Sequence, residues 1–448
     1  MSEDKRARLK QWLESGEAKL HPLTFPQREL WEASPVPVTD PTNQVCCLIN
    51  VKGLITFPDC VEALRRVVER QEVLRLSFVP GKDQPLQLVR RSTGEPNISL
   101  RELSPAQSTP EAIEELAQEL FREPFDLVQA PLYRATLLRR AVDDHAIVFT
   151  IHHAIADGWT LGVFVQDLFG AYLQGMMGVR EALPPVPQTY SAWGAAERNA
   201  WPPAELAEKA AYWKTALAGS PRLWKPSEES NSQAPIRWLS AVPTDVTAAA
   251  RELARRSGAT LFNTLLAAFQ VALSHWTGED DLVVGTPVAN RSRPAVRETM
   301  GSYSAIVPLR GQVDRGRSFS ESLRAVQQTT VDAFTHAMPF AELVKAVGER
   351  SAPGSNPIFN VRFALQNHPV PDVSFPTLGA KLRMRWTGTA RFDLACELTE
   401  KGDALEIAWL FRPGQFPQAE IEDLESLFQN ALSSACRSPD SRIAALLS

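Results

Sequence analysis

Cysteine is scarce in this chain and follows no pattern. No two cysteines have the Cys-x-x-Cys spacing and no His-Glu-x-x-His segment occurs, so nothing indicates a zinc site. The number of cysteines is odd, which gives no basis for a disulfide framework and fits a reducing compartment. We therefore predict a cytoplasmic protein without a bound metal. The cysteines are Cys46, Cys47, Cys60, Cys396 and Cys436.

Long apolar runs and blocks of like charge are missing as well. No stretch approaches about 18 uninterrupted apolar residues, which excludes a conventional transmembrane helix. The charged residues 1–8 are not followed by the apolar segment of a secretory signal. The net charge is −5, and Lys and Arg are spread along the chain, which gives no basis for nucleic-acid binding. We expect neither a membrane nor a nucleic acid as partner.

The length and composition predict a soluble protein of two lobes. Apolar residues make up 44% and charged residues 22%, as in globular proteins, and 448 residues exceed what one core usually serves. Three prolines within residues 181–188 cannot continue a helix or a central strand, so we place the junction there. The predicted parts are a leader helix at 1–20, an N-terminal lobe at 21–180 and a C-terminal lobe at 181–448.

Hydrophobic periodicity predicts individual elements within these parts. An exposed loop is expected at 220–236, where Pro, Ser, Glu and Asn are frequent. The predicted elements are a helix at 4–19, a strand at 46–51, a helix at 57–71, a hairpin turning at 142–144, a helix at 261–276, a strand at 281–288, a hairpin formed by 389–398 and 405–410, and a helix at 421–436.

One turn carries residue types suited to chemistry. The apolar run 145–151 predicts a strand buried on both faces, and the residues from 159 onward repeat at helical spacing. Neighbouring side chains of a strand leave on opposite faces, so only one of His152 and His153 can face a given cavity. A neutral imidazole there could accept a proton near pH 7.

Asp157 and Gly158 follow on the same turn. Asp157 could hold the backbone or pair with a distant arginine, and Gly158 would allow a positive φ or a close approach. The residues alone leave two other interpretations open. The histidines could be packed or capping groups, or His and Asp could bind a metal ion.

Ordered motifs along the chain resemble those of the condensation domains of nonribosomal peptide synthetases, in the superfamily of chloramphenicol-acetyltransferase-like acyltransferases. The central match is the His-His-x-x-x-Asp-Gly sequence at residues 152–158. Gln71 replaces the usual His of a second motif, and Tyr303 and Ala305 replace the usual Phe and Asn of another. The other matching segments are Leu23–Trp31, Glu69–Phe78, Pro124–Leu127, Tyr190–Trp193, Met300–Arg310, His336–Phe340, Ser355–Asn360 and Arg391–Leu394.

The resemblance implies an α/β (α+β) fold in which two acyltransferase-like lobes form a V-shaped pseudo-dimer with a tunnel between them. Donor and acceptor carrier proteins would dock at the two mouths and insert phosphopantetheine arms, so that no cofactor is bound covalently to this chain. The reaction would be acyl transfer from a carrier thioester to the amine of an acceptor, giving an amide in natural-product assembly. The chain would be a monomer or part of a larger synthetase.

The resemblance also implies roles for single residues. The catalytic residues would be His152, His153, Asp157 and Gly158. Of these, His153 would act as a base or would orient the amine, and the Gly158 N–H would steady the oxyanion. Asp157 would form a cross-lobe ion pair with Arg291. The residues expected to line the tunnel are Trp159, Tyr303, Ser304 and His336.

Expectations also follow for two arginines and for the functions that remain as alternatives. Taken alone, Arg70 is expected to be a solvated helix-end charge, whereas the resemblance implies that Arg75 packs the floor of the N-terminal lobe. No second-lobe Glu-Gly-His-Gly-Arg segment of the epimerisation type occurs, and the intact double histidine does not fit heterocyclisation or recruitment domains. The alternatives left are a standalone transferase that uses acyl-CoA or makes an ester, and a non-catalytic carrier-docking module.

Overall fold

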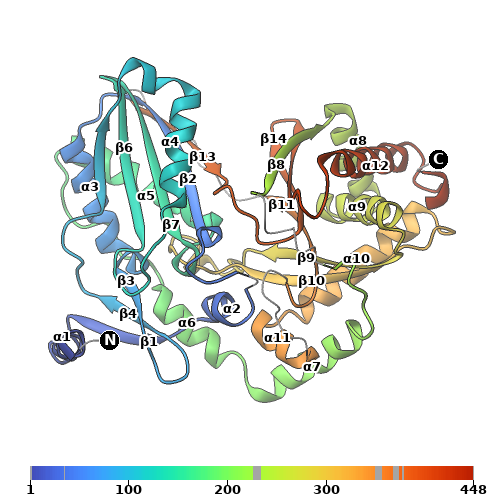
Figure 1. Cartoon of the computed structure of the whole chain (residues 1–448), viewed down its shortest axis with the longest axis horizontal. Helices are drawn as coiled ribbons and strands as arrows, with labels where there is room; N and C mark the ends of the chain where they lie inside the picture. The colour runs from blue at the N-terminus through green and yellow to red at the C-terminus, as the bar shows by residue number, and fades with distance from the viewer. Residues whose placement is uncertain are drawn as a thin grey trace.

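The computed structural model describes residues 3–34, 36–225, 234–348, 356–366, 373–375 and 378–446. Figure 1 shows two lobes that meet along one edge and open towards the other, so that they form a V. Each lobe is built around a six-stranded sheet. Part of the predicted loop at 220–236, and Ser355 of one motif, lie outside the described residues.

The sheet of the first lobe has the strand order β12-β13-β2-β7-β6-β5 and is covered by helices on both faces. Alternating side chains of β2 explain the two layers, because Cys47 and Ile49 pack with α3 and α5 while Cys46 and Leu48 pack with α4. The bounds are β2 Gln44–Gly53, β5 Ile98–Glu102, β6 Tyr133–Ala141, β7 Asp144–His152, β12 Val373–Phe375, β13 Leu378–Arg385, α3 Phe57–Arg70, α4 Pro110–Arg122 and α5 Gly158–Met176.

The strand that leads to the double histidine is the most enclosed of this sheet. β7 pairs antiparallel with β6 on one side and with β2 on the other, and all but its first residue are buried. Both faces being covered explains the near-continuous apolar run 145–151. The predicted hairpin that turns at 142–144 is confirmed.

The N-terminal segment differs from the predicted leader helix. Helix α1 (Glu3–Glu14) ends before Gly16, whose φ of 75° lies in the left-handed region. The chain then forms β1 (Ala18–Pro22), which pairs antiparallel with β4 in a small sheet of order β1-β4-β3. The leader therefore belongs to the first lobe. The other two strands are β3 Leu76–Val79 and β4 Leu86–Arg90.

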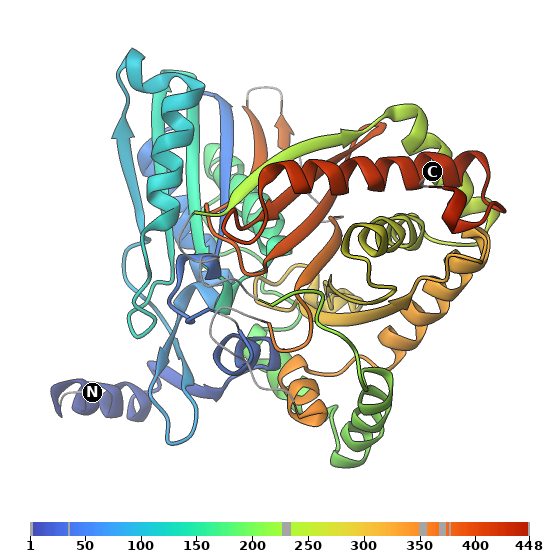
Figure 2. The same cartoon turned by 45° about the vertical axis from the view of Figure 1, so that its right-hand side comes forward.

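The sheet of the second lobe has the strand order β10-β9-β11-β14-β15-β8. In Figure 2, the red helix α12 crosses the front of this lobe. Phe269 of α9 stacks on Phe363 and contacts Trp409 and Phe428, which joins helices and sheet in one core. The bounds are β8 Ile236–Val242, β9 Asp281–Val288, β10 Ala305–Gln312, β11 Val361–Gln366, β14 Leu394–Lys401, β15 Ala404–Phe411, α8 Thr244–Arg256, α9 Leu261–Thr277, α10 Phe319–Thr335 and α12 Gln418–Arg437.

One hairpin from the second half of the chain crosses to the first lobe. β13 pairs antiparallel with β2 along its whole length, so that Leu382 lies opposite Ile49, and β12 pairs with β13. The chain then returns to the second sheet as β14. A division into 21–180 and 181–448 does not describe this exchange, because the two added strands complete the first sheet.

Short helices join the lobes at the closed edge of the V. Arg28 of α2 pairs with Glu342 of α11 at 2.7 Å, and Lys345 of α11 pairs with Glu32 of α2 at 2.9 Å. This cluster of four charges links elements far apart in sequence. The helices of this edge are α2 Phe25–Glu32, α6 Tyr190–Asn199, α7 Pro203–Ala216 and α11 Phe340–Val347.

Among the described residues, no single helix has the length and hydropathy needed to cross a bilayer. Helices α8 and α9 reach those values only when they are taken together, and they are bent by 110° relative to each other.

The packing of the second sheet gives a test of the fold. A Cβ atom at Gly285 of β9 would overlap the ring of Phe359, whereas a Cβ at Gly379 of β13 would meet nothing within 4 Å. We expect Gly285→Ala to lower the free energy of unfolding by about 1–3 kcal/mol, as overpacking does. Gly379→Ala should leave it unchanged or slightly higher. Equal urea midpoints for the two variants would contradict this packing.

Candidate active site

The double histidine lies at the end of β7, where the chain turns into α5. His152 is the last residue of the strand, His153–Ile155 form one 3₁₀ turn (η4), and α5 begins at Gly158 with Asp157 as its N-cap. The predicted strand-to-helix turn is therefore present. Gly158 takes an ordinary negative φ, since it begins the helix, so the positive φ considered for it does not occur.

His152 has a structural environment. Its Nδ1 accepts the Ala154 N–H at 3.0 Å, so the ring proton is on Nε2, which lies 2.9 Å from the carbonyl oxygen of Val38. Burial lowers the pKa of His152 to about 4, and the charge of Arg391 adds to that effect, although the Val38 carbonyl opposes it. His152 is therefore neutral near pH 7, and it braces the turn.

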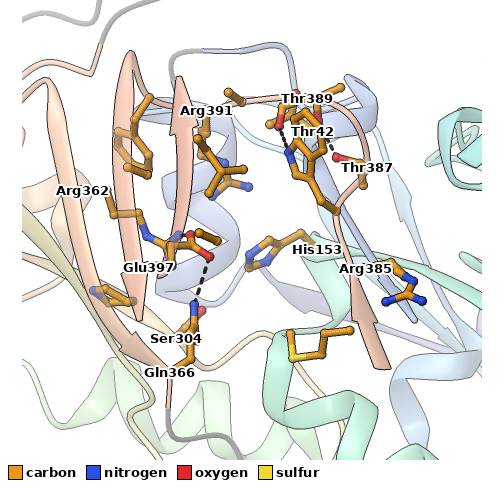
Figure 3. A pocket seen from close by; sticks show the side chains of 18 of the residues that line it. Thr42, His153, Ser304, Arg362, Gln366, Arg385, Thr387, Thr389, Arg391 and Glu397 are labelled. Atoms are coloured by element: carbon orange, nitrogen blue, oxygen red, sulfur yellow. Dashed lines mark hydrogen bonds and ion pairs between the residues drawn. The ribbon is translucent and has the colours of Figure 1, made fainter. Parts of the chain in front are cut away.

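His153 faces the other way, into a cavity between the lobes (Figure 3). Its Nδ1 has no hydrogen-bond partner among the described residues. Burial lowers the pKa of His153 to about 3, and the charge of Arg391 lowers it further, which outweighs Asp157. The imidazole is therefore uncharged at physiological pH. It can accept a hydrogen bond from a group that enters the cavity.

Asp157 is held by the N-terminus of α5 and by the second lobe. Its carboxylate accepts the N–H and hydroxyl of Thr160, both at 3.0 Å, and the backbone N–H of Tyr303 at 3.1 Å. Arg291 donates to both carboxylate oxygens, at 3.0 Å and 3.3 Å. Both partners of this ion pair are buried. The predicted Asp157–Arg291 contact is present, and the carboxylate is fully engaged in structure.

Gln27 of α2 holds the 3₁₀ turn from the closed edge of the V. Its amide nitrogen donates to the Ala154 carbonyl at 2.9 Å and to Gln87 at 3.1 Å. The residue that follows His153 is thereby tied to a helix that also carries the cross-lobe charge cluster. The 3₁₀ turn is thus held by His152 where it begins, by Gln27 at Ala154, and by Asp157 where α5 begins.

The cavity has a volume of about 1010 Å³ and takes its walls from both lobes. One wall is the cleft-facing side of β13, and the other comes from β11, β14, β15 and β8. Ser304 lies on this wall, as predicted. Figure 3 shows Ser304 and His153 around the same space, together with the Arg362–Glu397 ion pair.

The other predicted tunnel residues do not line this cavity. Tyr303 is fully buried, and the guanidinium of Arg291 lies 4.0 Å from its ring centre. Trp159 donates from Nε1 to the Arg297 carbonyl at 3.0 Å, away from the cavity wall. His336 ends α10, where its ring stacks on Tyr212 at 3.8 Å. The sequence could not separate lining from supporting residues, because the contacts of these three rings are with residues distant in the chain.

Gly158 is also not among the residues that line the cavity. The role suggested for its N–H as an oxyanion donor therefore has no support from this geometry. The first turn of α5 is oriented by Asp157 instead.

Arg70 is not the solvated charge expected from its position at a helix end. It forms ion pairs with Asp167 of α5 and with Glu298 of the second lobe. Gln71, which stands where the family usually has His, donates to Asp167 at 2.8 Å and accepts the Met300 N–H at 2.9 Å. An amide can donate and accept at once, so Gln71 bridges the lobes without a charge.

Arg75 has the packing role that the resemblance implied. Its guanidinium donates to the carbonyls of Val68 at 2.9 Å and of Arg90 at 2.6 Å, which ties the end of α3 to β4.

Three charged residues of the cavity were missed by sequence reasoning. Glu29 of α2 lines it, and burial raises the pKa of this carboxyl to about 7, although Arg391 opposes the shift. Arg391 and Arg362 lie on the same walls, and burial lowers the pKa of Arg362 to about 10. No local pattern marks these three residues, because Glu29 lies on α2, Arg362 on β11 and Arg391 between two strands. No group of metal ligands occurs among the described residues.

The Asp157–Arg291 contact predicts a large loss of stability when one partner is removed. We expect Asp157→Asn to lower the free energy of unfolding by about 3–5 kcal/mol, because Arg291 would keep a buried charge without a counter-charge. Lys10→Gln breaks an exposed pair with Glu14 and should cost less than about 1 kcal/mol. Urea unfolding would measure both, and similar small losses would show that the buried pair contributes little.

The lowered pKa of His152 predicts that the free energy of unfolding depends on pH. The unfolded chain binds a proton at this residue below about pH 6.5, whereas the folded chain does so only below about pH 4. The stabilisation contributed by His152 is therefore complete above pH 6.5 and is lost as the pH falls towards 4. It should decrease by up to about 1.4 kcal/mol per pH unit.

The measurement is the difference in unfolding free energy between the native chain and His152→Gln, recorded from pH 7 to pH 4. That difference should shrink as the pH falls, while His275→Asn, at an exposed position of α9, should show no such trend. A constant difference for His152→Gln would contradict a buried neutral ring.

Comparisons with known proteins extend over nearly the whole chain. A family model described as Condensation domain matches residues 18–448. The chain is 30% identical over 436 residues to phosphinothricin tripeptide synthetase PhsC of Streptomyces viridochromogenes, covering 95% of this chain and 40% of that protein. It is 30% identical over 414 residues to malpinin synthetase of Mortierella alpina, covering 90% and 5%. The chain thus spans less than half the length of these two relatives.

Solved structures share the fold at lower identity. SgcC5 of Streptomyces globisporus superposes with a TM-score of 0.78 at 23% identity, covering 94% of this chain and all of that one. The first condensation domain of the calcium-dependent antibiotic synthetase, in complex with a substrate analogue, gives 0.78 at 19% identity, covering 95% and 98%. These likenesses confirm the predicted chloramphenicol-acetyltransferase-like fold. Because the family match extends from residue 18 to the end of the chain, the protein belongs to the condensation-domain family of nonribosomal peptide synthetases.

Proposed function

We propose that this chain forms an amide bond by transferring an acyl group from a phosphopantetheine thioester to the amine of an acceptor. The observation that carries the proposal is a single imidazole, that of His153, which faces a cavity of about 1010 Å³ shared by two lobes. Such a cavity is large enough for two reactants to meet. Holding them there supplies much of the acceleration, since a thioester is already activated.

The bonds change in a simple order. The amine nitrogen attacks the thioester carbonyl carbon and gives a tetrahedral intermediate. The C–S bond then breaks, and the departing sulfur takes up the proton that the nitrogen loses, so the products are an amide and a thiol.

His153 orients the amine in this reaction. Because its pKa lies near 3, the ring is a poor acceptor of a full proton at pH 7, but it remains a good acceptor of a hydrogen bond. An N–H of the attacking amine directed at the ring would aim the nitrogen lone pair at the carbonyl carbon. This favours a positioning role over general-base catalysis.

The reactants would arrive on partner proteins. Donor and acceptor carrier domains would each insert a phosphopantetheine arm, which is a substrate tether and not a cofactor of this chain. The greater length of the synthetase relatives supports a place for this chain within a larger assembly. The cysteines of the chain are all free thiols, which supports a cytoplasmic location.

The test uses an acyl-loaded carrier protein and an amine acceptor, with intact-protein mass spectrometry of the products. We expect His153→Ala to lower the rate of amide formation by at least about 100-fold. Its circular dichroism and melting temperature should remain native-like, because the ring lines the cavity and its Nδ1 has no hydrogen-bond partner among the described residues. His336→Gln is the matched control, since that ring stacks on Tyr212 outside the cavity, and it should retain full activity.

Three other outcomes of this assay would contradict parts of the proposal. An ester formed with a hydroxyl acceptor in place of an amide would replace the proposed nucleophile. Carrier binding without any acyl transfer by the native chain would identify a docking module. Full turnover by His153→Ala would remove this residue from the mechanism.

A further inference from the structure

The charge of the cavity is opposite to that of the protein. The whole chain has a net charge of −5, yet seven of the cavity residues are Arg or Lys and four are Glu. Low-dielectric walls of one sign concentrate the field inside a cleft and attract ligands of the other sign. The cavity is therefore suited to an anion, provided that its cations are not already neutralised.

Several of these charges are neutralised by protein partners. Arg362 pairs with Glu397, and Lys401 pairs with Glu406 at 2.9 Å. Glu400 pairs with Arg251 at 2.7 Å. Three of the four cavity carboxylates are thereby engaged.

Arg385 also has a partner, Glu114 of α4, at 3.1 Å. Arg237, Lys381, Arg383 and Arg391 have no carboxylate within ion-pair distance in the part of the chain that the structure describes. Arg237, Lys381 and Arg383 are exposed on strands β8 and β13. Arg391 is the one of these four whose charge acts on His153.

Arg391 lies in the segment between β13 and β14, and its side chain reaches across to the first lobe. Within the described part of the chain, it donates one hydrogen bond, to the amide oxygen of Asn43 at 2.6 Å. Figure 3 shows Arg391 and His153 pointing into the same cavity. The proximity of the two groups also appears in the lowered pKa of His153, to which the charge of Arg391 contributes.

Arg391 is half-buried, and its only hydrogen-bond partner among the described residues is an amide oxygen, so its remaining donors are free for a ligand in the cavity. Among the described residues, Glu29 is the cavity carboxyl without an ion-pair partner, and both Glu29 and Asp40 act on the charge of Arg391 without forming an ion pair with it. The pKa of Glu29 near 7 means that this carboxyl is only partly ionised at neutral pH. The planar donor fork of Arg391 matches a carboxylate or a similar oxyanion and is open to the cavity.

We propose that Arg391 is a specificity-determining anion site, and that one of the two substrates brought to His153 carries a carboxylate or another oxyanion. This inference rests on the proposed function, because it names the class of substrate for the same site. The anion could come with the acyl donor or with the amine. The experiment therefore has one arm for each source.

The donor arm compares glutaryl-pantetheine with its terminal primary amide, neither of which has an amine. The acceptor arm compares 4-aminobutanoate with 4-aminobutanamide, neither of which has a thioester. Isothermal titration calorimetry at pH 7.5 measures the Kd of each probe for the full chain. On one of the two arms, the native protein should bind the carboxylate at least about tenfold more tightly than the amide, as expected for charge-assisted contacts.

Variants assign this preference to one residue. Arg391→Gln should remove it while the melting temperature stays close to native, and Arg391→Lys should retain part of it. Arg383→Gln is the matched control, because it removes a cation from the exposed face of the same cavity, and it should keep the preference. Equal Kd values on both arms, a preference that survives Arg391→Gln, or one that Arg383→Gln abolishes would overturn the assignment.

Product analysis separates this inference from the proposed function. If amide forms equally well with the charged and the neutral probes, the anion site is refuted while the proposed function stands. If the carboxylate is preferred in binding and no probe pair yields amide, Arg391 is an anion site and the proposed function fails.

Discussion

The structure depends on the buried carboxylate of Asp157. This group accepts hydrogen bonds from the first turn of α5, from Arg291 and from the backbone N–H of Tyr303. It therefore joins the strand-to-helix turn to the second lobe. A buried charge of this kind tolerates little displacement, because any movement leaves an ion without its partner. The position of His153, four residues earlier, is therefore tied to the relative placement of the lobes. In the proposed mechanism Asp157 therefore acts by fixing the geometry of the turn.

The two histidines of the turn have different roles. His152 uses both ring nitrogens to brace the backbone, whereas His153 directs its ring into the space between the lobes. Both are kept neutral, chiefly by burial and in part by the charge of Arg391. In this account the protein supplies a hydrogen-bond acceptor of fixed direction and a confined space, and the thioester supplies the chemical activation. We propose that Arg391 then favours substrates that carry an oxyanion.

Hydrophobic periodicity in the sequence predicted the strands and helices that are buried along their whole length. The enclosed strand β7, its hairpin with β6 and the long buried helix α9 all show an unbroken periodicity. The crossing of β12 and β13 to the first sheet was not predicted, because a strand carries no local sign of which sheet it joins. Arg70 was misjudged for a related reason, since its partner Glu298 is 228 positions away. The wall of the cavity was only partly predicted, because Tyr303 and Ser304 are neighbours in sequence and only one of them reaches the open space.

The central claim is that an uncharged ring at position 153 is presented to the reactants. Nitrogen-15 NMR of histidine-labelled protein tests it directly, with the signals of His153 identified by their loss in a variant that lacks this ring. A buried neutral ring should keep the shifts of a neutral imidazole from pH 8 down to pH 5. Half-protonation near pH 6.5 would instead show a solvated histidine.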